Sequence, residues 1–198
     1  MKLHFASIII LSLGALIKAT EISNGGSSVG HKGGVLVHEE TEMVEVLRLP
    51  EGFDYRDPAL GIQQREDGVF LIPDYAKIDG ANLTTMAVTV QTWCETTPAS
   101  PFVTDIIQLT YYLYGIKDWN CCQMRKDFPC TNMKKYASAA TDICGPYLAC
   151  HKCQLSGEST QKIFKSCMNS KWGKAGGYVR RIYDGWFPYM TDVNVYHT

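Results

Sequence analysis

Alternation of apolar and polar residues marks three strands in the carboxy-terminal part of the chain. The segment TMAVTVQTWC at residues 85–94 alternates and is rich in β-branched residues, so it predicts a strand that ends at Cys94. The segments YVRRIY at 178–183 and TDVNVYH at 191–197 alternate in the same way. Because alternation places one apolar face against a core, we expect these strands in a sheet that is covered on one side.

Two further segments have the periodicity of amphipathic helices. In the first, Ser100 is placed to cap the helix, Pro101 suits its first position, and Gly115 follows its last turn. In the second, at residues 157–168, Ser156 is the predicted N-cap. The residues predicted to face the core are Phe102, Ile106, Leu109 and Leu113 in the first helix, and Thr160, Ile163, Phe164, Cys167 and Met168 in the second.

The order of these elements predicts the class of fold. Between the helices, residues 132–144 and 147–153 can form the two strands of a hairpin around a Gly-Pro turn. The order strand, helix, hairpin, helix, strand is typical of an α+β fold of the split β-α-β kind. We therefore expect an antiparallel sheet with two helices packed on it.

The amino-terminal half differs in composition and predicts how the chain is divided. Residues 1–19 combine a short basic start with an apolar run and a small residue, Ala19, at the expected cut, which indicates a signal peptide. Residues 20–45 are acidic and rich in Gly and Ser, and we expect them to form a disordered tail. Residues 46–85 contain many turn signals and either pack on the rest or form a removable leader. Residues 86–198 are the predicted cysteine-rich domain.

The distribution of charge and hydropathy limits the possible cellular locations of the protein and the classes of partner that it could bind. Residues 20–85 hold 12 acidic and 5 basic side chains, whereas residues 86–198 hold 8 acidic and 12 basic ones. This surplus is too mild to predict nucleic-acid binding. No segment after residue 19 is apolar enough to span a bilayer, so we expect a secreted, extracellular protein.

All eight cysteines follow the predicted signal peptide, and an oxidising compartment favours disulfides there. Three of them lie in CGPYLACHKC, residues 144–153, which leaves two alternatives. CHKC has the spacing of a thioredoxin motif, and Cys144, Cys150, His151 and Cys153 could bind zinc. Secreted thiols usually oxidise before they bind metal, so disulfides are the preferred interpretation and no metal or cofactor is expected. The predicted disulfide residues are Cys94, Cys121, Cys122, Cys130, Cys144, Cys150, Cys153 and Cys167.

The expected topology predicts which cysteines meet. Successive strands and helices carry the chain from one end of the sheet to the other, and a disulfide needs Cα atoms within about 7 Å. Cys94 is then predicted to pair with Cys144 or Cys167. Cys121 or Cys122 is predicted to pair with Cys150 or Cys153, and His151 has no role in this scheme.

Within about residues 86–198, the chain has, in this order, Cys144, Leu155-Ser156-Gly157-Glu158, Cys167, Gly176-Gly177 and Val193-Asn194-Val195-Tyr196. In this pattern the cysteine-rich domain resembles the fungal killer-toxin-like secreted proteins, which include necrosis-inducing effectors. It implies a small disulfide-stabilised α+β fold and a toxin or virulence role. The acidic amino-terminal segment has no counterpart in it.

The sequence contains few candidates for catalytic residues. There is no HExxH, phosphate-loop or EF-hand pattern. A hydrolase could use His151 as a base with Asp142 or Asp184 as its orienting partner, while His197 is the other histidine in the domain. An acidic pair could instead come from Glu95, Asp105, Asp142, Glu158 and Asp184. The absence of a motif favours a protein that acts by binding, with a hydrolase and a propeptide-masked toxin as alternatives.

Two surfaces and one modification site are candidates for recognition. A basic face is predicted from Lys162, Lys165, Lys171, Lys174, Arg180 and Arg181. An apolar loop with Trp186, Phe187 and Tyr189 either packs on the core or contacts a partner. Such a partner would be a host or competitor protein, or a membrane surface. The sequon at Asn82 predicts an exposed turn that can carry a glycan.

Overall fold

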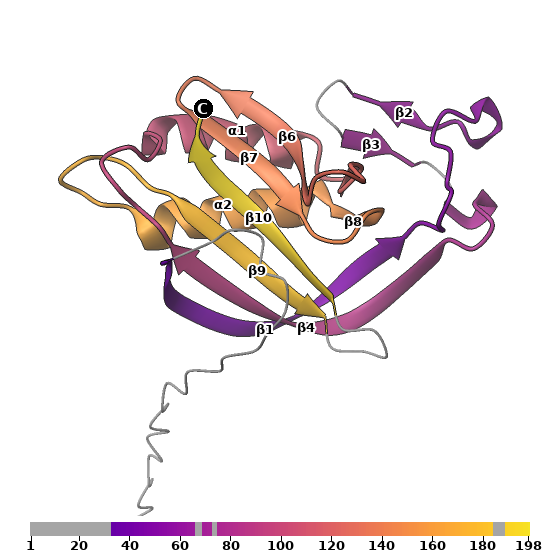
Figure 1. Cartoon of the computed structure of the whole chain (residues 1–198), viewed down its shortest axis with the longest axis horizontal. Coiled ribbons are helices and arrows are strands. Elements are labelled where there is room, and N and C mark those ends of the chain that lie inside the picture. The colour runs from indigo at the N-terminus through magenta and orange to yellow at the C-terminus, as the bar shows by residue number, and fades with distance from the viewer. Residues whose placement is uncertain (1–32, 66–68, 73–74, 184–188) are drawn as a thin grey trace, which may run out of the picture.

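The structure, a computed structural model, describes residues 33–65, 69–72, 75–183 and 189–198. Within them, ten strands form one sheet in the order β2-β3-β5-β8-β1-β4-β9-β10-β7-β6, and every neighbouring pair is antiparallel (Figure 1). The strands are β1 (Val35–Arg48), β2 (Gln63–Gln64), β3 (Val69–Leu71), β4 (Asn82–Cys94), β5 (Asn120–Cys122), β6 (Cys130–Tyr136), β7 (Ala139–Cys144), β8 (Ala149–Lys152), β9 (Gly177–Tyr183) and β10 (Tyr189–His197).

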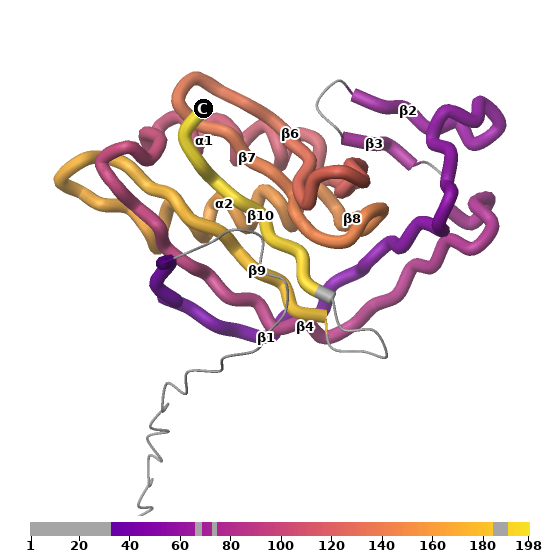
Figure 2. Tube along the Cα trace, in the orientation of Figure 1, coloured from indigo at the N-terminus to yellow at the C-terminus, as the bar shows by residue number. Residues whose placement is uncertain are grey.

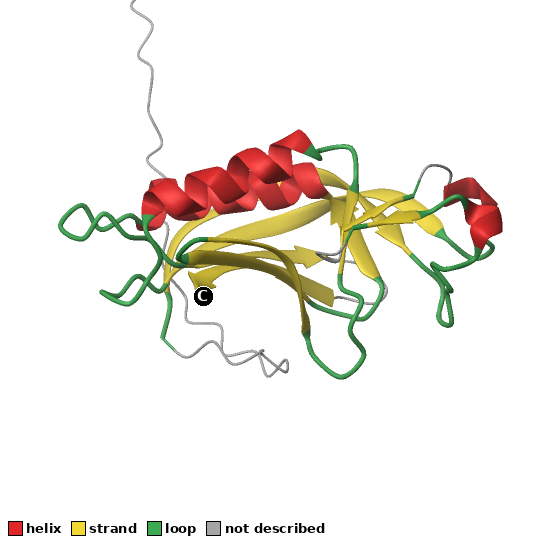
Figure 3. Ribbon diagram, turned by 90° about the horizontal axis from the view of Figure 1, so that it is seen from above, coloured by secondary structure: helices red, strands yellow, loops and turns green. Residues whose placement is uncertain are grey.

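Both α-helices, α1 (Val103–Gly115) and α2 (Cys153–Cys167), lie on the same face of the sheet (Figure 3). Helix α1 packs on β6 and β7, and α2 packs on β4, β9 and β10. Their apolar stripes cover alternate residues of the strands, and Ile106, Leu109 and Ile163 are fully buried against Val90 and Val179. The described helices are too short and too polar to cross a membrane.

The prediction of an antiparallel sheet with two helices is confirmed, but the protein is richer in strands than a split β-α-β sandwich. The predicted strand at 85–94 is β4 without its first three residues, and the segments at 178–183 and 191–197 lie in β9 and β10. The additional strands are β1, β2 and β3, which come from residues 35–71, and short strands such as β5 and β8, which contain disulfide-bonded cysteines. The short strands do not extend far enough to show a periodicity of their own.

Strand β1 corrects the predicted disordered tail. Residues 35–45 lie in β1, which pairs with β4 along its whole length, so the two strands run side by side as a long ribbon (Figure 2). At Val46–Arg48, β1 also pairs with β8. The strand therefore extends back to Val35 from the alternating residues Val44, Val46 and Leu47.

The region at 46–85 packs on the rest of the protein. A small apolar cluster joins Leu47, Leu49, Phe70 and Ile72 to the sulfurs of Cys122 and Cys150. Two 3-10 helices, Pro58–Leu60 and Tyr75–Lys77, lie in the connections of this region. This segment holds no cysteine, but one disulfide lies at the centre of its core.

The middle hairpin and both helix starts also differ from the predictions. Residues 132–144 hold most of β6 and all of β7, and the chain turns back between these strands at Ala137, which has a positive φ of 46°. Residues 149–152 pair instead with β1 and β5 as β8. Helix α1 begins at Val103 with Phe102 as its N-cap, and the Ser100 hydroxyl instead accepts a hydrogen bond from the Thr97 backbone.

In α2, the first residue is Cys153, and Ser156 lies inside the helix. Its buried face includes Thr160, Ile163 and Cys167 as predicted. Met168 follows the helix and is half exposed, with 51% of its surface accessible.

Candidate contact site

All eight cysteines are paired. The disulfides are Cys94–Cys167, Cys121–Cys153, Cys122–Cys150 and Cys130–Cys144. Three of these bridges confirm the predictions. They are Cys94–Cys167, Cys121–Cys153 and Cys122–Cys150. Cys144, Cys150 and Cys153 are thus committed to disulfides, which removes the zinc and thioredoxin-like alternatives.

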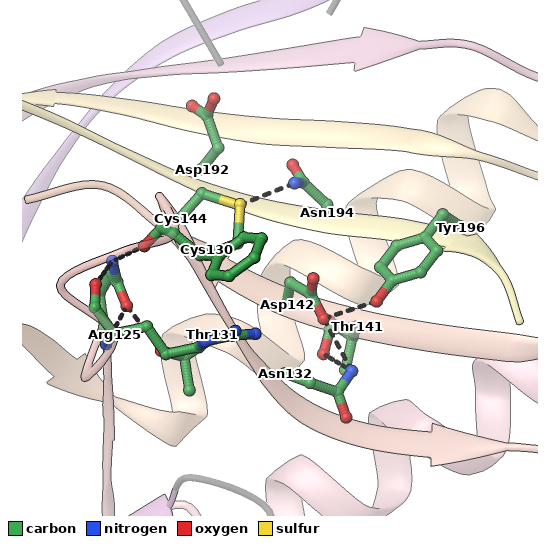
Figure 4. Close-up of a disulfide and its surroundings, with 12 residues drawn as sticks. Arg125, Cys130, Thr131, Asn132, Thr141, Asp142, Cys144, Asp192, Asn194 and Tyr196 are labelled. Atoms are coloured by element: carbon green, nitrogen blue, oxygen red, sulfur yellow. Dashed lines mark hydrogen bonds between the residues drawn. A yellow bond between two sulfur atoms is a disulfide. The ribbon is translucent and has the colours of Figure 1, made fainter. Parts of the chain in front are cut away.

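The bridge between Cys130 and Cys144 was not predicted. The expected topology placed these residues at opposite ends of the sheet, but β6 and β7 form a hairpin in which they face each other directly. The sulfur of Cys144 also accepts a hydrogen bond from the Asn194 side chain at 2.9 Å (Figure 4). This disulfide therefore ties the start of β6 to β7 and, through Asn194, to β10.

Two disulfides enclose the loop of residues 123–129, which joins β5 to β6. Cys122 precedes the loop and Cys130 follows it, and their partners Cys150 and Cys144 are the two ends of the segment 144–150. Residues 122–130 and 144–150 therefore form one closed covalent ring, which we call the disulfide ring. A ring of this kind restricts the conformations of both segments.

Backbone contacts hold the two sides of the disulfide ring together. The Leu148 amide donates to the Gln123 carbonyl at 2.8 Å, and the Gly145 amide donates to the Pro129 carbonyl at 2.9 Å. Gly145 has a φ of 147°, and a Cβ at this position would lie 2.8 Å from the Met190 carbonyl oxygen. The turn therefore requires glycine, and it fixes the ring against β10.

The buried side chain of Gln123 organises the loop from the inside. Its amide nitrogen donates to the carbonyls of Arg125 and Phe128 at 2.8 and 2.7 Å. Its amide oxygen accepts from the Arg125 backbone at 2.8 Å and from the Thr131 hydroxyl at 2.6 Å. Thr131 in turn accepts from the Met124 backbone at 2.8 Å. The loop is thus held by five hydrogen bonds around two side chains.

The outer side of the same loop is exposed. Residues 125–129 all lie on the surface, and 55% of Phe128 is accessible. The Arg125 guanidinium stacks on the Phe128 ring at 4.0 Å, and the Lys126 ammonium lies 5.0 Å from the Tyr147 ring centre. A shallow cleft of about 270 Å³ runs between the loop and Tyr147. The combination of exposed cations and aromatic rings on a rigid loop is typical of contact surfaces.

A polar cluster lies beside the disulfide ring, on the sheet face away from the helices (Figure 4). One oxygen of Asp142 accepts hydrogen bonds from Asn132 at 2.7 Å and from the Tyr196 hydroxyl at 2.9 Å. Burial and the neighbouring Asp142 carboxylate raise the pKa of Tyr196 to about 12. Further along β10, Asp192 accepts one hydrogen bond on each carboxylate oxygen from the Arg180 guanidinium of β9, both at 2.9 Å. These groups satisfy one another and order the sheet beside the loop.

The predicted base, His151, is buried beneath α2. Its Nε2 shares a hydrogen bond of 2.8 Å with the Ser156 hydroxyl, and only 1% of the residue is accessible. Burial, with a smaller contribution from the positive Arg181, lowers the pKa of His151 to about 3. The imidazole is therefore neutral at physiological pH and closed to any substrate.

The candidate acidic residues occupy separate elements. Asp105 in α1 accepts hydrogen bonds from Ser138, Glu158 in α2 accepts from Gln154, and Asp142 is bound as described above. Glu95 follows β4, at the strand end tied to α2 by Cys94. Asp184 lies outside the described residues, and His197 at the end of β10 hydrogen-bonds to the Thr198 carbonyl. The four described carboxylates thus come from different elements.

The predicted basic face is not formed, because its members lie on different sides of the protein. Arg181 is fully buried under α2, where it donates to Ser159 at 2.7 Å, and Arg180 points to the opposite face of β9. Lys162 binds Glu40 at 2.5 Å and also Glu42, both in β1. Of the six residues, only Lys165 and Lys171 are exposed, while Lys174 is half-buried over the Phe102 ring.

Two other predicted sites have different outcomes. Trp186 and Phe187 lie outside the described residues, and for Tyr189 only its place at the start of β10 is described. Asn82 is exposed at the first position of β4, so its sequon is accessible. The loop residues Gln123, Arg125, Lys126 and Phe128 were missed, although their placement between Cys122 and Cys130 was a usable signal.

The fold and this site define a disulfide-bonded, sheet-rich protein that carries two helices on one face and a cross-linked surface loop. No protein-family model, curated protein or solved structure matches the chain.

Proposed function

We propose that the chain is a secreted protein that acts on another organism, as a toxin or host-directed effector, by binding a partner protein through the loop at 123–129. It acts without catalysis. The observation that carries this proposal is the contrast between the two sides of the loop, which is held inside by Gln123 and two disulfides and exposed outside at Arg125, Lys126 and Phe128. A preordered loop loses little conformational entropy on binding, which favours affinity.

The four disulfides and the signal-peptide-like start of the chain support an extracellular site of action. The sequence resemblance to killer-toxin-like proteins supports the toxin or effector role. The burial of His151 argues against the alternative hydrolase, since a base must reach its substrate.

The test uses the purified protein in the two assays that the resemblance suggests, growth inhibition of fungal cells and necrosis of infiltrated leaf tissue. We expect activity in at least one assay. The combined variant Arg125→Ala, Lys126→Ala and Phe128→Ala should abolish it, because these side chains form the proposed contact surface.

A matched control replaces two exposed cations and one exposed apolar residue elsewhere, with Lys165→Ala, Lys171→Ala and Met168→Ala. This variant should keep full activity. Inactivity of the wild-type protein in both assays, or equal activity of the loop variant, would contradict the proposal. Turnover of esterase, glycosidase or peptidase substrates that is lost in His151→Ala would establish the hydrolase instead.

A further inference from the structure

The backbone of the loop at 123–129 is presented in two different ways. The amide and the carbonyl of Arg125 both bind the Gln123 side chain, and so does the carbonyl of Phe128. Between them, within the described part of the chain, Lys126 and Asp127 make no backbone hydrogen bond and are exposed. The peptide bond between residues 126 and 127 is thus held out to solvent between two anchored carbonyls.

We propose that this loop is a substrate-like inhibitor of trypsin-like serine proteases, with Lys126 as the residue that enters the protease's acidic specificity pocket. The inference rests on the proposed function, since it names the class of partner for the same loop. A serine protease of this class recognises a lysine or arginine side chain and must reach the carbonyl of that residue with its oxyanion hole. Lys126 meets both requirements, whereas the Arg125 carbonyl is already bound to Gln123.

The disulfide ring explains why such a loop inhibits the protease and does not simply serve as a substrate. Attack of the protease serine on the Lys126 carbonyl carbon breaks the bond to Asp127 and forms an ester, while the serine proton passes through the protease histidine to the Asp127 amine. The amine cannot leave, because the Cys130–Cys144 bridge keeps its segment on the ring. It can attack the ester, restore the peptide bond and return the proton to the serine.

The Gln123 side chain strengthens this effect. Its amide nitrogen binds the carbonyls of Arg125 and Phe128, one on each side of the exposed bond. Both new chain ends would therefore stay attached to the same buried group after cleavage. One contact must be given up on binding, because the Lys126 ammonium leaves the Tyr147 ring.

The experiment titrates bovine trypsin with the full secreted protein and follows cleavage of a small lysine substrate. We expect saturable inhibition that Lys126→Arg retains and Lys126→Ala weakens by about 30-fold or more, as for a central contact residue. Lys171→Ala is the matched control, since Lys171 is an exposed lysine far from the loop in sequence, and it should inhibit like the wild type. Lys126→Phe should transfer inhibition from trypsin to chymotrypsin, whose pocket is apolar.

A second variant tests the role of the scaffold. In Gln123→Ala the carbonyls of Arg125 and Phe128 lose their common donor, and we expect faster cleavage after Lys126 with weaker inhibition. The two fragments should stay linked until the disulfides are reduced, which mass spectrometry can follow.

Three results would overturn the inhibitor proposal. These are a folded, fully disulfide-bonded wild-type protein that does not inhibit trypsin, equal inhibition by Lys126→Ala, or rapid cleavage after Lys126 without inhibition. Each leaves the loop-dependent activity of the previous section standing if the bioassays support it. Conversely, trypsin inhibition with no bioassay activity would support the inhibitor and reject the toxin or effector role.

Discussion

His151 is the residue whose burial has the clearest measurable consequence. Its pKa is about 3 in the folded protein, compared with about 6.5 for an unfolded chain. Between these values the unfolded state binds a proton that the folded state does not, so the free energy of unfolding falls as pH falls. Over this range the free energy of unfolding should fall by about 1.4 kcal/mol for each unit by which the pH is lowered. Above about pH 6.5 the contribution of His151 to stability is present in full.

Urea unfolding at several values between about pH 4 and pH 7 tests this prediction. His151→Asn cannot titrate, so its stability should depend less steeply on pH by about 1.4 kcal/mol per unit. The variant is expected to be less stable overall because Ser156 changes its partner. Only the slope matters, and parallel slopes for the two proteins would show that folding does not lower the pKa of His151.

Asn82 provides a second prediction at the scale of one residue. Its exposed position at the start of β4 leaves the sequon accessible to the glycosylation machinery. Expression in a eukaryotic secretion host should give a product whose mass falls by one glycan in Asn82→Gln. Identical masses for the two secreted proteins would mean that the site is not used.

The residues of the loop show where sequence reasoning reached its limit. The cysteines were recognisable because of their number and compartment, and three of the four bridges matched the predicted choices. The place of Gln123 between two cysteines marked the loop but not the role of this side chain, which binds four groups of the loop and of β6. Buried polar organisers of this kind depend on the tertiary fold.

At the scale of elements, the four bridges close chain segments of very different length. Cys130 and Cys144 are separated by 14 residues and join neighbouring strands, whereas Cys94 and Cys167 are separated by 73 residues and join β4 to α2. In the chain-entropy model, these bridges stabilise the folded state by about 3 and about 4 kcal/mol.

Paired Cys→Ala variants of each bridge should therefore differ in thermal unfolding. We expect the variant without Cys94–Cys167 to show the larger loss of stability. The variant without Cys130–Cys144 should instead show the larger increase in proteolysis within 123–129, because this loop loses one of its two anchors. Equal proteolysis of the loop in both variants would contradict the role of the disulfide ring.

Long strands with alternating apolar residues were predictable from the sequence. Short strands, and the strand with charged residues on its inward face, were not. Strands β4 and β10 present an apolar face to the helices, and β9 presents Val179 and Tyr183 on either side of the buried Arg181, so their periodicity identified them. Strand β1 was overlooked because its face toward α2 carries Glu40 and Glu42, which bind Lys162. Charged residues at inward positions resemble a solvated tail until their partner on a distant helix is known.

At the scale of the whole molecule, the position of β1 decides whether the amino-terminal segment is removable. It lies between β4 and β8, so cleavage near residue 85 would remove a central strand together with β2 and β3. The new edges of β4 and β8 would be unpaired, which promotes aggregation. The structure therefore favours a mature chain that keeps these residues.

Intact-mass measurement of the secreted product tests this point. We expect a species that begins at Thr20. A chain that starts at residue 86 is expected either not to fold or not to be secreted. A mature product beginning near residue 86, folded and active, would restore the interpretation of a toxin masked by its propeptide.

The position of β9 and β10 makes one part of the sheet depend on another. The two strands are hydrogen-bonded between β4 and β7, so they connect the β6–β7 hairpin to the long β1–β4 ribbon. Asn194 of β10 also donates a hydrogen bond to the sulfur of Cys144 in β7. A displacement of the hairpin after loss of the Cys130–Cys144 bridge would therefore be transmitted through β10 and β9 to β4, whose last residue, Cys94, is bonded to α2.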